Sequence, residues 1–137
     1  DEAYEIIKSQ ATHKHPSDTA ILLPDKNFGF ACVSHFESKK NLKVNHVFED
    51  SAAKKYHRHK KAFWMGDSRL KMSTIHSFKG WEVPNVIVVI PSFIPGDEEL
   101  YDRIVYTAIT RSKENLIIIN ANGRYWEFGD SISDEWR

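Results

Sequence analysis

The chain has 137 residues, 41% of them hydrophobic and 28% charged, which suits one domain with its own core and excludes a disordered tail. Its 19 basic and 19 acidic residues balance, which excludes a protein that binds nucleic acid through bulk positive charge. Its single cysteine, Cys32, excludes an internal disulfide and a cysteine-rich zinc site. No apolar run approaches the roughly 20 residues of a membrane-spanning helix, and the acidic N-terminus lacks a signal-peptide pattern. We therefore expect a cytoplasmic protein without a membrane partner and, since residue 1 is not Met, a fragment of a longer polypeptide.

The first half of the chain is predicted to contain two strands and one helix. Residues 19–23 form a short apolar run closed by Pro24, which is typical of a buried strand. Residues 27–39 place apolar side chains near helical spacing, and residues 43–48 alternate polar and apolar side chains as a strand does.

The second half is predicted to contain three further strands and one long helix. Residues 70–75 form a strand that leads into a polar loop. Residues 85–90 are β-branched and apolar on both faces, as in a central parallel strand. The acidic residues 97–99 suit the N-terminus of a helix that runs to about Arg111, and residues 116–119 form a further buried strand.

Strands separated by helix-length segments predict parallel pairing through right-handed crossovers. The expected fold class is therefore α/β, with three layers around a mostly parallel central sheet. Such sheets bind ligands at the carboxyl ends of their strands, so the loops after Ile75, Ile90 and Ile119 are the expected places for a site. The architecture alone does not indicate a function, because this fold class hosts many.

The most informative segment is residues 73–82, Ser-Thr-Ile-His-Ser-Phe-Lys-Gly-Trp-Glu. It leaves one strand through small and polar residues and reaches Gly80 before the next apolar strand. Such a loop can offer backbone N–H groups and hydroxyls to a phosphate, and a glycine lets the backbone approach closely. The alternative is a polar loop with a turn glycine, and these residues alone leave both interpretations open.

A second segment, residues 104–114, ends an expected helix with Thr107, Thr110 and Arg111 close together. Arg111 can complement the helix dipole, a contribution of about 0.3–1 kcal/mol. It can also present its planar, permanently charged guanidinium to a phosphate group. The segment by itself is compatible with either role.

Together the two segments resemble motifs V and VI of the UvrD/Rep-like superfamily 1 helicases, in order and in separation. The first resembles T-x-H-x-x-K-G-x-E and the second V-Y-x-A-x-T-R-x-K, each followed by a hydrophobic strand. The matching residues are Thr74, His76, Lys79, Gly80 and Glu82 in the first, and Val105, Tyr106, Ala108, Thr110, Arg111 and Lys113 in the second. The resemblance covers residues 75–120 firmly and the first half of the chain weakly.

The resemblance implies that residues 1–137 form a single RecA-like domain, the C-terminal motor domain of an ATP-dependent DNA helicase or translocase of bacterial type. In such helicases two RecA-like domains hold ATP between them, so the partners would be single-stranded or duplex DNA and an N-terminal RecA-like domain of the same polypeptide. By that similarity Arg111 would be the catalytic arginine finger at the γ-phosphate. Lys79, Gly80 and Glu82 would lie at the ATP, with Glu82 accepting a hydrogen bond from the ribose.

Similarity also implies that Thr74, His76 and Ser77 face the single strand or link it to the nucleotide site.

The sequence departs from the family pattern in two respects. The sequence has no G-x-x-x-x-G-K-[ST], the Walker A motif, so Mg²⁺ would be held by the N-terminal domain and this chain should not hydrolyse ATP by itself. The early helix also lacks the usual arginine, for which Lys26 is a weak substitute.

Residues 49–69 form a basic loop where many relatives insert a large accessory domain, so that domain is expected to be absent or to have been removed here. They contain the basic run 54–61, followed by Phe63 and Trp64. Charge with aromatic rings can track a phosphate backbone and stack a base, so Lys60, Lys61 and Trp64 are candidate nucleic-acid ligands. The alternative is a solvated loop with one aromatic anchor in the core. No metal site is expected.

Two other functions compete with the motor. One is a degenerate helicase-like module that binds nucleic acid or protein without motor activity, and the other is an unrelated nucleotide-binding α/β domain. The intact Lys79-Gly80-x-Glu82 and Arg111 favour the motor, because a module without ATP chemistry has no physical need for them. An upstream Walker A lysine would decide between the first two.

Overall fold

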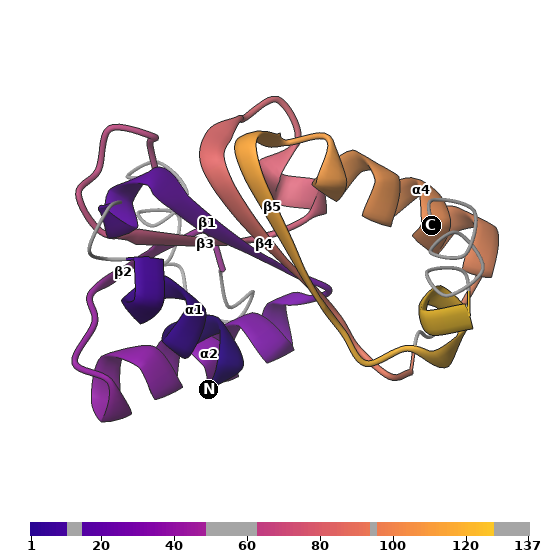
Figure 1. The fold of residues 1–137 in the computed structure, drawn as a ribbon, viewed down its shortest axis with the longest axis horizontal. Coiled ribbons are helices and arrows are strands. Elements are labelled where there is room, and N and C mark those ends of the chain that lie inside the picture. Colours follow the sequence, from indigo (N-terminus) through magenta and orange to yellow (C-terminus); the bar gives the residue numbers. More distant parts are fainter. Residues whose placement is uncertain (11–14, 49–62, 94–95, 128–137) are drawn as a thin grey trace, which may run out of the picture.

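The computed structural model describes residues 1–10, 15–48, 63–93 and 96–127 (Figure 1). Its strands all run parallel, in the spatial order β2-β3-β1-β4-β5. The elements in chain order are α1 (Glu2–Gln10), η1 (Pro16–Asp18), β1 (Thr19–Leu23), α2 (Lys26–Lys39), β2 (Val44–His46), β3 (Leu70–Thr74), η2 (His76–Phe78), β4 (Val83–Ile90), α4 (Glu98–Ile109) and β5 (Ser112–Asn120). The predicted α/β class with a parallel central sheet is confirmed, and the sheet is parallel throughout.

Helices lie on both faces of this sheet, which makes the three expected layers. Side chains of successive strand residues point to opposite faces. Val89 of β4 lines a groove with residues of α1 and α2, whereas its neighbour Ile90 lines a groove with residues of α4. Figure 1 accordingly shows α1 and α2 together on one side of the sheet and α4 beyond β4 and β5.

The core is centred on β1, whose five residues are all buried. β1 pairs with β3 through Leu23 and Thr74 and with β4 through Thr19 and Asn85, so it lies between the two strands that flank residues 75–82. Because β3 and β4 are parallel, that connection must return from the carboxyl end of β3 to the amino end of β4. At about 3.3 Å per strand residue this is a crossing of roughly 20 Å.

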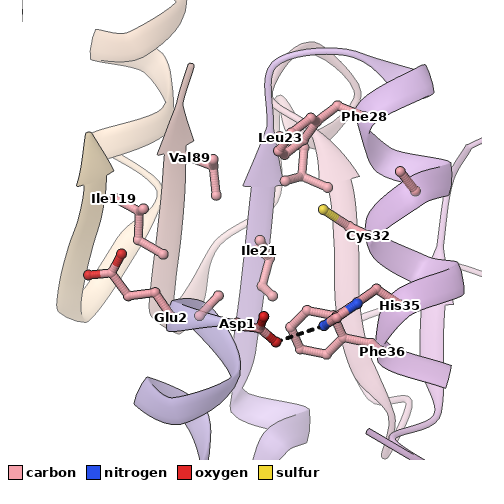
Figure 2. A pocket seen from close by; sticks show the side chains of 12 residues that line it. Asp1, Glu2, Ile21, Leu23, Phe28, Cys32, His35, Phe36, Val89 and Ile119 are labelled. Atoms are coloured by element: carbon pink, nitrogen blue, oxygen red, sulfur yellow. Dashed lines mark hydrogen bonds and ion pairs between the residues drawn. The ribbon is translucent and has the colours of Figure 1, made fainter. Parts of the chain in front are cut away.

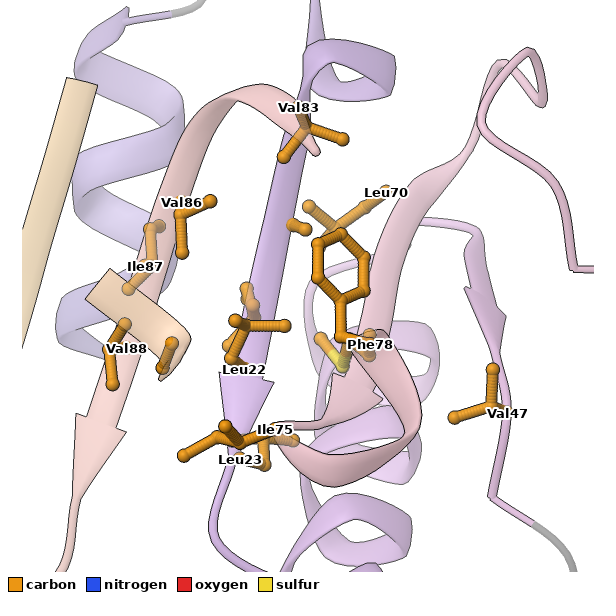
Figure 3. Packing of buried hydrophobic residues seen from close by; sticks show 14 of the residues in the cluster. Leu22, Leu23, Val47, Leu70, Ile75, Phe78, Val83, Val86, Ile87 and Val88 are labelled. Carbon is orange, nitrogen blue, oxygen red and sulfur yellow. The ribbon is translucent and has the colours of Figure 1, made fainter. Parts of the chain in front are cut away.

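The crossing is held down by η2. Phe78 is completely buried and Ile75 nearly so, and Figure 3 shows the Phe78 ring pointing from η2 toward the strands. The segment predicted as a polar loop is therefore a structural layer whose Ile75 and Phe78 side chains belong to the core. Its polar side chains are left on the outer surface.

Two elements differ from expectation. The apolar run in β5 predicts a buried strand, but within the described residues β5 lies at an edge of the sheet, with Leu116 40% and Ile118 45% exposed. An apolar run does not distinguish a central strand from an edge strand that only one helix partly covers. Helix α1 is not predicted by the sequence pattern, and only its Ile7 is fully buried.

A groove of about 410 Å³ lies on the face of the sheet away from η2, between α1, α2 and the strands (Figure 2). Cys32 and Phe28 of α2 line this groove. At its rim a carboxylate oxygen of Asp1 lies 2.9 Å from Nε2 of His35. Burial raises the pKa of the Cys32 thiol. Cys32 therefore serves as a small apolar side chain of the α2–sheet interface.

Lys71 of β3 is a fully buried lysine. Its ammonium donates to the backbone carbonyls of Ser17 and, at 2.9 Å, Asp67. Burial lowers its pKa, because the charged form loses water that the carbonyls only partly replace. The side chain ties η1 to the turn that precedes β3.

Gly29 of α2 gives a stability test of the core. Alanine is normally better than glycine inside a helix by about 1 kcal/mol. A Cβ at Gly29, however, would lie 2.5 Å from the ring of Phe48, which is only 1% exposed. Gly29→Ala should therefore lower the free energy of unfolding, by about 1–3 kcal/mol, as measured by urea denaturation.

Gly123→Ala is the matched control, because nothing lies within 4 Å of a Cβ built at Gly123. It should leave stability unchanged or slightly raised. Equal stability of the two variants would contradict the close packing of Phe48 against α2.

Candidate functional site

The ends of the two motif segments lie side by side at the amino ends of β4 and β5. Val83 pairs with Ser112 in the sheet register, and the Val83 N–H donates to the Arg111 carbonyl at 3.3 Å. This pairing places Glu82 and Arg111, which are far apart in sequence, next to the same sheet edge. The nucleotide residues expected from the sequence thus share one end of the domain.

Glu82 and Lys113 connect the motifs through their side chains. The Lys113 ammonium lies 3.6 Å from a Glu82 carboxylate oxygen, and the Lys113 and Glu82 side chains are 58% and 52% exposed. An ion pair this exposed contributes little to stability, about 0–1 kcal/mol. The ion pair places the Glu82 carboxylate beside the start of β5, where it remains accessible to a ligand.

Gly80 has a backbone conformation that favours glycine, with φ of +91°. No atom lies within 4 Å of where its Cβ would be, and Lys79 beside it is exposed. The turn-glycine interpretation is therefore correct for the backbone. The same open space also leaves the backbone approachable, so the two interpretations of the sequence are compatible.

Arg111 follows α4 directly. The helix begins at an Asp97 cap, whose carboxylate accepts from the Glu99 N–H at 2.9 Å. At the other end the Arg111 Nε donates to the Thr107 carbonyl at 3.1 Å, and Nη2 donates to the Thr110 hydroxyl at 3.1 Å. Arg111 thus does meet the negative end of the helix dipole. Among the described residues these bonds use two of its five N–H donors, which leaves the others for a phosphate.

Thr74, His76 and Ser77 lie at the other end of the crossing, after the carboxyl end of β3. The Thr74 hydroxyl accepts from the Ser77 N–H at 3.1 Å and so stabilises the first turn of η2. His76 is exposed and, with Lys79 and Thr107, lines a shallow hollow of about 130 Å³ between η2 and α4.

The placement corrects the expectation that the site follows the carboxyl ends of the strands. Of the loops named for this, the one after β3 carries Thr74 and His76, but the loops after β4 and β5 carry no predicted site residue. Glu82 and Arg111 lie at amino ends, because residues 75–82 traverse the whole sheet before β4 begins. The crossing separates Glu82 and Arg111 from Thr74, whereas Lys79 lines the same hollow as His76.

Trp64 is a surface residue, and the aromatic anchor is its neighbour. Phe63 is buried and makes edge-on contacts with Phe78 and Trp81, with ring centroids 6.5 and 6.3 Å apart. Trp64 is 59% exposed, and its indole lies on Gly66, where a Cβ would come within 2.1 Å of the ring. Trp64 precedes β3, so it lies away from Thr74 at the far end of that strand. Lys60 and Lys61 fall outside the described residues.

The turn that carries Trp64 is held by an ion pair. Asp67 accepts from the Arg69 guanidinium at 2.8 and 2.6 Å and from the Arg69 N–H at 2.9 Å. These hydrogen bonds lower the pKa of Asp67 from 3.8 to about 2. At neutral pH the pair is fully charged, and the turn is fixed directly before β3.

Two polar partners in the site are not predicted from the sequence. There, Lys113 and Thr110 both appear as matches to motif VI, and Thr110 also as part of the cluster at the helix end, but neither is paired with another residue. The Glu82–Lys113 ion pair and the Arg111–Thr110 hydrogen bond become visible only in the folded chain. Among the described residues no three His, Cys, Asp or Glu side chains are grouped to hold a metal ion.

Both motif segments lie within a match to a known protein family. Residues 70–119, from the start of β3 almost to the end of β5, match the UvrD-like helicase C-terminal domain. Comparison with curated protein sequences gave no significant match. No helix in the described ranges has the length and apolar character needed to cross a membrane. The match covers both motif segments and joins a parallel, helix-flanked sheet consistent with the RecA-like fold. The part of the chain that carries the site is therefore similar to the UvrD-like helicase C-terminal domain.

Proposed function

We propose that this domain is the C-terminal motor domain of an ATP-dependent DNA helicase. It supplies Gly80, Glu82 and Arg111 to an ATP site that it shares with an N-terminal RecA-like domain. The observation that carries the proposal is the adjacency of the motif ends, through the Val83–Arg111 backbone hydrogen bond and the Glu82–Lys113 ion pair. A module without ATP chemistry would not need these groups at one edge.

The donor set fits a nucleotide. Arg111 and Lys79 supply cationic N–H donors for phosphate oxygens, and the open backbone at Gly80 lets a phosphate approach. The accessible Glu82 carboxylate can accept from a ribose hydroxyl. Bound ATP supplies the phosphoryl group, on whose oxygens charge develops during transfer, and a fixed arginine stabilises that charge. Mg²⁺ belongs in this proposal to the N-terminal domain, which would carry the Walker A motif.

The nucleic-acid part of the proposal rests on exposed groups. His76 at one end of the crossing and Trp64 at the other are both accessible. Trp64 offers a base an exposed indole that lies close against Gly66. Lys60 and Lys61 would add contacts to the phosphate backbone. Movement along DNA would follow if closure on ATP shifts one domain relative to the other.

The isolated 137-residue chain should show no ATP hydrolysis and only weak nucleotide affinity, because half of the proposed site lies on another domain. A coupled ATPase assay and nucleotide titration of the purified chain test this. Turnover that persists after contaminating ATPases are excluded would contradict a shared site.

Arg111 tests the catalytic role in the polypeptide that joins this domain to its N-terminal partner. Arg111→Ala should leave ATP binding largely intact and reduce DNA-stimulated hydrolysis by at least ~10³-fold, the low end for arginine fingers. Arg111→Lys should recover little, because an ammonium lacks the planar fork.

Lys43→Ala is the control for Arg111, since it also removes one positive charge, from an exposed site at the opposite edge of the sheet. It should hydrolyse ATP at the wild-type rate. Near-wild-type turnover by Arg111→Ala would leave Arg111 as a helix-capping residue and favour the module without motor activity.

Trp64 tests the DNA contact in the same polypeptide. Trp64→Ala should weaken binding of a labelled single-stranded oligonucleotide by about 1–3 kcal/mol, the value of one stacked base, without changing the salt dependence. Gly66→Ala should also weaken binding, because the new Cβ displaces the indole while leaving it in the chain. Replacing Lys60 and Lys61 by Ala should instead lower the salt slope, by about 0.7 for each phosphate that the protein then leaves unneutralised.

Trp126→Ala is the control, because the Trp126 residue is 61% exposed and Trp64 is 59% exposed. It should not change DNA binding. Melting of both variants should stay close to wild type, because neither ring is buried. Unchanged DNA binding by Trp64→Ala would remove this surface from the proposed interface.

A further inference from the structure

Three hydrogen bonds close a small network where α4 ends. The Thr110 hydroxyl donates to the Thr107 carbonyl at 3.0 Å. The same hydroxyl oxygen accepts from Arg111 Nη2, and Arg111 Nε donates to that same Thr107 carbonyl, each at 3.1 Å. The guanidinium is therefore held at two of its nitrogens, by one backbone acceptor and one side-chain acceptor.

The end of the helix makes this network possible. In a continuing α-helix the Thr107 carbonyl would accept from the Arg111 N–H. Here the Arg111 N–H donates instead to the Ala108 carbonyl at 3.1 Å, in a tighter last turn. The Thr107 carbonyl is thus one of the terminal acceptors that the helix itself leaves unfilled. Both the hydroxyl and the guanidinium fill it.

The hydroxyl of Thr110 has one proton and can accept elsewhere on its oxygen. Because that proton is given to Thr107, the oxygen presents its lone pairs to the arginine. The Thr107 hydroxyl donates to the Arg103 carbonyl at 2.8 Å, one turn earlier, and the Arg111 guanidinium reaches the carbonyl of Thr107 and the hydroxyl of Thr110. One side chain, Thr110, therefore decides how the Nη2 end of the guanidinium is oriented.

From this geometry we infer that Thr110 is a positioning residue for Arg111, holding its guanidinium in one orientation for the phosphoryl oxygens. The inference rests on the proposed arginine-finger role. Thr110 does not touch the nucleotide in this scheme; it acts only through Arg111. A freely rotating arginine would have to be ordered again in each catalytic cycle, whereas an oriented one is ready when the domains close.

A purely structural role for Thr110 predicts something different. Thr110 is exposed, so water can replace its hydrogen bonds when the hydroxyl is removed. Its removal should therefore leave the melting temperature almost unchanged. An effect on turnover without an effect on stability distinguishes positioning from support of the fold.

The test uses the polypeptide with both motor domains and compares Thr110→Val with Thr110→Ser. Valine keeps the shape and removes the hydroxyl, whereas serine keeps the hydroxyl. We expect Thr110→Val to lower kcat for DNA-stimulated ATP hydrolysis about tenfold, with the KM for ATP within about twofold of wild type. Thr110→Ser should restore kcat to within about threefold of wild type, and the melting temperatures of all three proteins should agree.

A double variant tests whether Thr110 acts through Arg111. Adding Thr110→Val to Arg111→Ala should cause no further loss of activity, because residues that act as one unit are not additive. Ser38→Ala is the control for removing a helix hydroxyl, since Ser38 donates to the Ser34 carbonyl on α2. It should leave kcat unchanged.

The outcomes separate this inference from the proposed function. If Arg111→Ala is inactive but Thr110→Val has wild-type kcat, the positioning role is overturned and the arginine finger stands. If Thr110→Val and Thr110→Ser both lose activity and stability together, Thr110 is structural and the inference is overturned. If Arg111→Ala itself keeps wild-type turnover, the proposed function fails, and the inference fails with it.

Discussion

Parallel pairing of β3 and β4 on either side of β1 is the constraint on which the rest of the site depends. Since both strands point the same way, residues 75–82 have to cross the sheet before β4 can begin. Burial of Ile75 and Phe78 holds this crossing against the strands. These two side chains belong to the core, and the polar groups of the segment remain on the surface.

In the proposed motor, the crossing would also let one short motif contact two ligands. Thr74 and His76 emerge where β3 ends, while Glu82 emerges where β4 begins, beside Arg111. The core contact of Phe78 links the two ends mechanically, because neither can move far without disturbing it. In the proposed motor, this linkage is a physical route by which a change at Glu82 and Arg111 reaches Thr74 and His76.

The end of α4 shows how a helix terminus can orient an arginine side chain. The tight last turn of α4 leaves the Thr107 carbonyl without its usual helical partner, and Arg111 and Thr110 donate to it. The contact with the helix dipole and the proposed contact with a phosphate are therefore not competing roles for Arg111. The dipole contact orients the guanidinium, and its remaining donors stay free for a ligand.

The amino-acid sequence by itself determined the strands, the two main helices and the two motifs. Apolar runs such as residues 19–23 and the Asp97 cap signal are local, and both were confirmed. Adjacency and exposure were decided only by the tertiary structure. It made β5 an edge strand, placed Phe63 rather than Trp64 in the core, and brought Glu82 and Arg111 together at the amino ends of neighbouring strands. These properties depend on which strands pair and which face a helix covers, and such long-range contacts leave no periodic signal in the residues themselves.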